Sequence, residues 1–198
     1  MPRIVWAYIR AIDAMNRFIG RVAMYLIFVL IGVLLWSSVS KTFFNPSLWT
    51  LETAQFVMVA YYVLGGPYSI QLGSNVRMDL FYGAWSVRTK ACVDAFTVFF
   101  LLFYLGVLLY GAVGSTAYSL GYFGTEPFSW FWQVFKTLVT QGPTAAGEMF
   151  GFMERSSTAW RPLIWPIKAV LCLGVFLMLL QALAELCRDI LRLKGEAV

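Results

Sequence analysis

The sequence contains four apolar runs that are too long for the core of a small soluble protein. They cover residues 22–44, 50–72, 93–118 and 163–187. A helix needs about 20 apolar residues to cross a hydrocarbon core of about 30 Å, because each residue advances the helix by about 1.5 Å. The runs therefore predict an all-α integral membrane protein with four transmembrane helices, folded as a single membrane domain.

The composition supports this class and excludes several others. The chain is 60% hydrophobic and 13% charged, whereas soluble domains are about 45–50% apolar and about 25% charged. The absence of histidine removes the usual ligands of catalytic zinc and haem and the base of ordinary catalytic triads. The three cysteines form no CxxC pair, so we expect them to pack as small apolar residues. No cofactor or metal is predicted.

The distribution of lysine and arginine predicts the orientation of the chain. The net charge of +5 comes from dispersed residues that flank apolar runs, so nucleic acid is not an expected partner. Ten of the 15 basic residues lie in the N-terminal segment, loop 73–92 and tail 188–198, and five lie on the other side. The positive-inside rule then places both termini in the cytoplasm. Loop 119–162 would be periplasmic, with the chain in a bacterial inner membrane.

Residues 1–21 precede the first span and show helical periodicity. One predicted face comprises Ile4, Tyr8, Ala11, Met15, Phe18 and Ile19, and the opposite face comprises Arg3, Arg10, Asp13 and Arg17. A basic amphipathic helix beside a span usually lies in the membrane interface; the alternative is a cytoplasmic extension of the first span. In both cases Arg3, Arg10, Arg17 and Arg21 are expected to anchor the chain at an anionic lipid surface.

The second run begins near Trp49 and Glu52 and is interrupted by Gly65-Gly66-Pro67. Glu52 falls in the first helical turn, where the helix dipole favours a carboxylate. The proline removes a backbone donor and should kink or locally unwind the helix. Asn45, in the preceding turn, is the predicted N-cap. An interrupted helix without a symmetric mate is weak evidence for a substrate site, so a kink or close packing is preferred.

Two further segments offer surfaces for packing. Gly111, Ser115 and Ser119 recur every four residues along the third run, which would let another helix approach closely. In loop 119–162, residues at about 128–140 place apolar side chains at helical spacing. This segment is too short to span a bilayer, so we expect a short interfacial helix.

Neither a catalytic site nor a transport pathway is visible. The sequence has no metal-ligand cluster, no nucleophile paired with a base and no phosphate-binding glycine loop. Glu52, Asp94, Lys168 and Glu185 all fall in end turns of the spans, and Lys41 lies at the far end of the first. Transport sites usually lie near the bilayer midplane. The chain is therefore predicted to be a packing partner and not an enzyme.

Two groups of residues resemble a known family. The first comprises Trp49, Glu52, Gly65, Gly66, Gly73, Val76, Arg77 and Asp79, and the second comprises Ser157, Trp160, Pro162, Trp165, Pro166, Lys168, Gln181 and Ala184. Together they are similar to the small four-helix membrane subunit (DctQ-like, Q subunit) of tripartite ATP-independent periplasmic (TRAP) transporters. The chain departs from the family at Asn75, where many members carry histidine, and in a longer insert at residues 124–154.

The resemblance implies a scaffold with defined partners. In this family the small subunit binds a large multi-helix permease subunit that carries substrate and sodium, and a periplasmic binding protein delivers an organic acid. This chain would enlarge and anchor the static part of the permease. Its expected partner-interface residues are Trp49, Glu52, Gly65, Gly66, Arg77, Asp79, Gly111, Ser115, Ser119, Trp130, Trp132 and Phe135.

Two other functions stay open on the sequence. One is an accessory or stabilising subunit of a different membrane complex. The other is a small membrane enzyme, which a bound chromophore or metal would reveal.

Overall fold

The fold is a bundle of long helices, seen here in a computed structural model that describes residues 3–73 and 87–193. Its helices are α1 (Arg3–Met24), α2 (Leu26–Phe43), α3 (Thr50–Leu72), α5 (Val87–Ser119), α6 (Pro127–Gln141), α7 (Pro143–Glu148) and α8 (Trp165–Leu193). Within the described ranges the only β pairing is an isolated bridge between Arg155 and Leu163. The all-helical class predicted from the apolar runs is confirmed.

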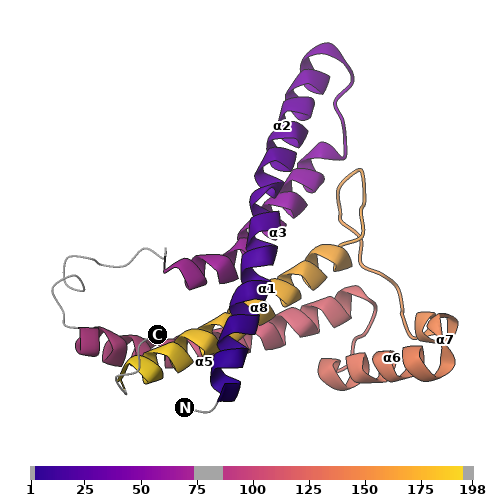
Figure 1. Ribbon diagram of the computed structural model, residues 1–198. Coiled ribbons are helices and arrows are strands. Elements are labelled where there is room, and N and C mark those ends of the chain that lie inside the picture. Colours follow the sequence, from indigo (N-terminus) through magenta and orange to yellow (C-terminus); the bar gives the residue numbers. More distant parts are fainter. Residues whose placement is uncertain (1–2, 74–86, 194–198) are drawn as a thin grey trace.

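Helices α1 and α2 form one long helix with a single turn between them at Tyr25 (Figure 1). Together they cover 41 residues, which corresponds to about 60 Å at about 1.5 Å per residue. This length is about twice what a bilayer core requires. The continuity agrees with the alternative in which residues 1–21 extend the first span.

Helix α3 has the bounds predicted for the second run. Figure 1 shows it changing direction as it passes behind α1, and Pro67 lies within it. The predicted N-cap at Asn45 is wrong, because Trp49 occupies the N-cap position without a side-chain cap hydrogen bond. Residues 44–49 instead form a connection in which the Thr50 hydroxyl donates to the Ser47 carbonyl at 3.2 Å.

Within the described residues, three helices are long and apolar enough to cross a membrane. They cover Arg3–Phe43, Cys92–Ser119 and Trp165–Leu191. Helix α3 has the required length at 23 residues but is less apolar, because it includes Glu52, Gln55 and Gln71. A fourth span through α3 stays a prediction.

Helix α8 shares the centre of the bundle with α3. It packs against α1, α3 and α5, whereas α3 packs against α1, α2 and α8. Val175, Ala182 and Ala184 on α8 are fully buried. Glycines allow the close approaches around it. A Cβ added at Gly174 would lie 2.2 Å from a Val63 methyl on α3 and 2.8 Å from the Val63 carbonyl oxygen. Only a residue without a side chain fits there.

The beginning of α1 and the end of α8 lie together. Ile9 packs with Ala184 and Leu191 in one buried cluster. At the other end of α8, a second cluster joins Ala117, Leu120 and Trp130. This cluster fixes α6, which runs in nearly the same direction as the end of α5 and projects beyond it (Figure 1). Helix α6 covers the segment predicted at about 128–140; that it is an interfacial insert in an external loop stays a prediction.

Candidate functional site

A buried carboxylate marks the start of α3. Glu52 is only 4% exposed, and its Oε1 accepts a hydrogen bond of 2.5 Å from the Ser156 hydroxyl. The Thr158 hydroxyl donates to the same oxygen, whereas Oε2 has no hydrogen-bond partner among the described residues. Glu52, expected at a partner interface, is thus engaged inside this chain.

Glu52 holds a short hairpin, which we define as residues 154–164. The backbone N–H of Ser156 donates to the Pro162 carbonyl at 2.9 Å, and that of Ile164 donates to the Glu154 carbonyl at 3.2 Å. At the base of the hairpin, Lys168 forms an ion pair with Glu154 at 2.6 Å. These contacts fix the hairpin at both its base and its tip.

The hairpin base depends on a close approach of two backbones. Gly121 has a φ of +89°, and a Cβ added there would lie 2.5 Å from the Gly151 Cα. The hairpin tip presents exposed Trp160 and Arg161, and exposed Arg155 lies next to the base. The contacts at the hairpin base therefore fix the position of the hairpin at the end of the bundle.

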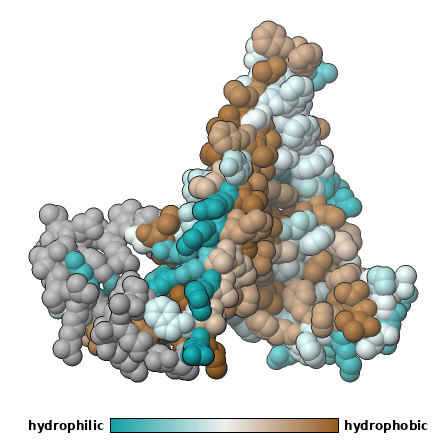
Figure 2. All heavy atoms as spheres, viewed as in Figure 1, coloured by the Kyte–Doolittle hydropathy of each residue, from teal (hydrophilic) through white to brown (hydrophobic). Residues whose placement is uncertain are grey.

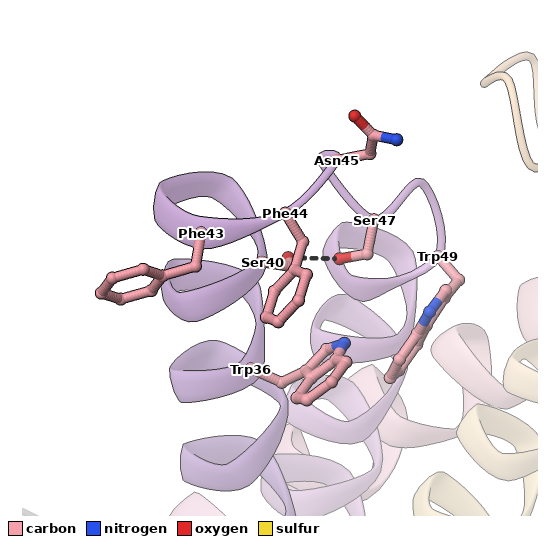
Figure 3. Close-up of a pocket in the computed structure, with 7 residues that line it drawn as sticks. All are labelled: Trp36, Ser40, Phe43, Phe44, Asn45, Ser47 and Trp49. Atoms are coloured by element: carbon pink, nitrogen blue, oxygen red, sulfur yellow. Dashed lines mark hydrogen bonds between the residues drawn. The ribbon is translucent and has the colours of Figure 1, made fainter.

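An open aromatic pocket of about 740 Å³ lies beside the α2–α3 connection. Figure 3 shows Trp36, Phe44 and Trp49 around it, with the Ser40 and Ser47 hydroxyls 3.1 Å apart behind them. None of the described residues that line the pocket is ionisable. Its chemistry suits an apolar or amphiphilic group and provides no acid, base or nucleophile.

A polar cluster joins α1 to α8 at the opposite end of the bundle; its members are Asp13, Asn16, Gln181, Glu185 and Arg188. The Asn16 amide donates to Gln181 Oε1 at 2.7 Å. Gln181 Nε2 in turn donates to Asp13 at 3.1 Å and to Glu185 at 3.2 Å. Arg188 forms ion pairs with both carboxylates. The cluster fixes the register of α1 on α8.

The predicted small-residue contacts divide between inner and outer surfaces. A Cβ added at Gly66 would lie 2.8 Å from the Met178 sulfur on α8, whereas Gly65 and Gly111 have open space among the described residues. Ser115 is exposed, but Ser119 is fully buried. Residues four positions apart are offset slightly around a helix. The series Gly111, Ser115 and Ser119 therefore passes from the outer surface of α5 at Ser115 to the buried side at Ser119.

The predicted aromatic residues of α6 divide in the same way. Trp130 is buried and stacks on Tyr122 with ring centroids 5.1 Å apart. Trp132 and Phe135 are 66% and 55% exposed and stack on each other. Only these two remain accessible to a partner. The predicted residues Arg77 and Asp79 lie outside the described residues.

The structure also identifies residues that the sequence analysis missed. The sequence pattern predicts that Asp13 lies on the arginine face of the N-terminal helix and Arg188 in the tail, and it gives no signal for the hydroxyls of Ser156 and Thr158. One signal was available, because Gln181, Glu185 and Arg188 recur at spacings of four and three residues. These spacings place them on one face of a helix. No group of three or more potential metal ligands occurs in the part of the chain that the structure describes.

The fold and these clusters define a multi-pass helical membrane protein whose polar residues serve packing. The chain belongs to the DctQ component family of the tripartite ATP-independent periplasmic transporters, because the model of this family matches residues 30–146. The match begins within α2 and ends within α7, before the hairpin and α8. No curated protein and no solved structure matches the chain.

Proposed function

We propose that this small TRAP permease subunit is a scaffold that binds and steadies the large permease subunit in the inner membrane. The family is a component of a transporter and not an enzyme family. In the described residues, the buried carboxylate of Glu52 and the half-buried carboxylate of Asp13 are engaged by partners on this chain. Such groups serve internal structure, so the residues that move substrate are expected on the large subunit.

The observation that supports this proposal is that some helix glycines contact another helix of this chain closely, whereas others face open space in the described structure. Gly174 contacts α3 closely, whereas Gly65 and Gly111 have no heavy atom of a described residue within 4 Å of an added Cβ. Small residues at a membrane helix surface let two backbones approach closely, and this packing drives association in lipid. We assign Gly65 and Gly111 to contacts with helices of the large subunit.

Gly65→Leu tests this assignment. We expect the variant chain to fold, because a Cβ added at Gly65 has no heavy atom of a described residue within 4 Å. Co-purification with the large subunit from detergent should fall at least fivefold, together with transport. Gly174→Leu is the control for a fold defect and should lower the yield of the chain itself. Normal recovery of the complex with Gly65→Leu would contradict the proposal.

We further propose that the exposed face of α6 contributes to docking of the periplasmic binding protein. Trp132 and Phe135 are its stacked exposed rings. Replacing both by serine spares buried Trp130 and should weaken docking of the purified binding protein several-fold, measured on reconstituted complex. Ser129→Ala with Gln133→Ala on α6 is the matched control. Unchanged docking affinity and transport in the serine variant would reject this role.

The turn that carries Arg77 and Asp79 is proposed to hold the cytoplasmic side of the assembly. Arg77→Ala with Asp79→Ala should loosen the complex in detergent. Co-purification at the wild-type level would count against this role.

Sodium-coupled uptake of an organic acid is proposed from the family resemblance. It is tested by uptake into vesicles that contain both membrane subunits, with binding protein added outside. Uptake should require both the small subunit and an inward sodium gradient. Equal uptake when the sodium gradient is absent would reject sodium coupling while leaving the scaffold role to its own test.

A further inference from the structure

The arginines of α1 form one column on its exposed side. Arg3, Arg10, Arg17 and Arg21 are all exposed. Spacings of seven and four residues keep them on one face of the helix. From Arg3 to Arg21 the column extends about 27 Å at about 1.5 Å per residue. Figure 2 shows hydrophilic residues along one side of α1 with hydrophobic residues beside them.

The acidic residue of α1 does not neutralise this column. Asp13 is turned toward α8, where it forms an ion pair with Arg188 and accepts a hydrogen bond from Gln181. Within residues 3–73 and 87–193, none of the four arginines forms an ion pair; Arg10 donates only to the Trp6 carbonyl, at 3.3 Å. The arginine column therefore keeps its positive charge available for an external anion.

An apolar column lies beside the arginine column. Ile4 is 77% exposed, Phe18 70% and Tyr25 68%. These residues also follow spacings of seven and fourteen, so they share one face. The predicted apolar face of α1 is thus partly exposed. A different face packs inward through Ile9, Asn16 and Gly20.

The inward packing of α1 fixes the positions of the arginine column and the apolar column. A Cβ added at Gly20 would lie 2.4 Å from the Tyr68 Cβ on α3, and Ile9 packs against Leu191 at the end of α8. Leu191 is also the last residue of the third candidate span. Ile9 thus lies beside the end of a candidate span, and neighbouring Arg10 is the part of the arginine column closest to the level where phospholipid headgroups begin.

We propose that α1 binds anionic phospholipids, with the arginine column on their phosphates and the apolar column against their acyl chains. An acidic protein surface would satisfy the arginines but not the adjoining row of exposed apolar side chains. A phospholipid offers both chemistries in one molecule. Basic residues at an anionic leaflet attract lipid through charge, and adjacent apolar residues add burial. This site is independent of the proposed contact with the large subunit.

The test uses the purified full chain in mild detergent, with its thermal unfolding followed during titration with phosphatidylglycerol, phosphatidylcholine or inorganic phosphate. Phosphatidylglycerol should raise the unfolding midpoint at lower concentration than phosphatidylcholine does, and sodium chloride should weaken the effect. Inorganic phosphate should have no comparable effect, because it lacks acyl chains.

Two variants distinguish this site from a general basic surface. Changing Arg3, Arg10, Arg17 and Arg21 together to glutamine should raise the required phosphatidylglycerol concentration at least tenfold. Arg155→Gln with Arg161→Gln, on the hairpin, should leave it unchanged. If the glutamine variant does not fold, the milder Arg10→Gln with Arg17→Gln is used, with a several-fold increase expected.

Equal responses of wild type and glutamine variant would overturn the proposal. It would also be overturned if phosphatidylcholine or inorganic phosphate reproduced the full effect of phosphatidylglycerol. Loss of the large subunit from the glutamine variant in lipid-free detergent would reassign the column to a protein contact.

Discussion

At the scale of single residues, Gly174 sets how closely α8 approaches α3. A methyl group at this position would overlap a Val63 methyl and approach the Val63 carbonyl oxygen. Overpacking of this kind typically costs about 1–3 kcal/mol. Gly174→Ala should therefore lower the thermal unfolding midpoint of the purified chain by several degrees.

Gly65→Ala is the matched control, since an alanine methyl there meets no described neighbour. Alanine favours a helix more than glycine does, so this variant should unfold at the wild-type temperature or slightly above. Equal destabilisation by both substitutions would show that the close approach of α3 and α8 at Gly174 does not cause the loss of stability.

Arg188 is the residue on which the polar cluster depends. Its guanidinium pairs with Asp13 and Glu185, and the three side chains are between 14% and 21% exposed. Removing one partner from a buried ion pair costs about 3–5 kcal/mol, and partial exposure reduces this figure. Arg188→Met should lower the unfolding midpoint markedly, because it leaves two carboxylates facing each other.

A compensating variant separates charge from packing at Arg188. Adding Asp13→Asn and Glu185→Gln to Arg188→Met removes the unpaired charges and should restore much of the lost stability. Failure of this triple variant to recover any stability would assign the role of Arg188 to packing of its side chain.

The residues at these sites can be recognised from the sequence, but the residues that they contact cannot. Glu52 was identified as a notable carboxylate at a helix start, but its partners Ser156 and Thr158 are more than 100 positions away. Serine and threonine are common in loops, so no local pattern distinguishes these two. Gly65 and Gly66 are neighbours that the sequence does not distinguish. In the described structure Gly66 faces Met178 inside the bundle, whereas Gly65 faces open space.

At the scale of elements, the hairpin is ordered by its contact with α3. Glu52 accepts hydrogen bonds from Ser156 and Thr158 near the hairpin tip, and exposed Arg155 immediately precedes them. Glu52→Ala removes the acceptor and should free the tip. We expect trypsin to cleave after Arg155 several-fold faster in this variant, as measured by mass spectrometry of the fragments.

Glu148→Ala provides the control for this experiment, because Glu148 is an exposed carboxylate outside the hairpin. Its cleavage rate after Arg155 should equal that of the wild type. The same rate in Glu52→Ala would mean that the backbone hydrogen bonds at the hairpin base are sufficient to hold the tip.

Helix bounds were predicted better than helix faces. The predicted second run coincides with α3, and the segment at about 128–140 falls within α6, because apolar period and glycine or proline boundaries are local signals. The inward face of α1 was not predicted. It includes Asn16, which pairs with Gln181 of α8 at 2.7 Å, and a buried polar pair cannot be recognised from one helix alone.

At the scale of the whole molecule, α8 and α3 share the central position, since α8 packs against α1, α3 and α5, and α3 packs against α1, α2 and α8. The long apolar run of α3 drew attention in the sequence because it is interrupted, whereas α8 is uninterrupted. Yet α8 contains the fully buried Val175, Gln181 and Leu191 and packs against three helices. Centrality depends on how helices are arranged in space, which hydropathy along the chain does not encode.

The positions of the two chain ends bear on the number of spans. Ile9 near the start of α1 packs against Leu191 near the end of α8, so the described ends lie at one end of the bundle. If only α2, α5 and α8 crossed the membrane, three crossings would leave these ends on opposite sides. If both ends lie on the same side of the membrane, the number of crossings is even, and α3 is the helix with the length to supply a fourth crossing. We therefore expect α3 to span despite its lower hydropathy.

Cysteine labelling on intact cells tests this four-span arrangement. After replacement of Cys92, Cys172 and Cys187, single cysteines at exposed Ala14, Ser157 and Leu193 would be treated with a membrane-impermeant maleimide. Four crossings with cytoplasmic ends predict labelling of Ser157→Cys alone. Three crossings would place Leu193→Cys outside, on the opposite side from Ala14→Cys. Labelling of both terminal positions without Ser157→Cys would keep four crossings but reverse the orientation predicted from the basic residues.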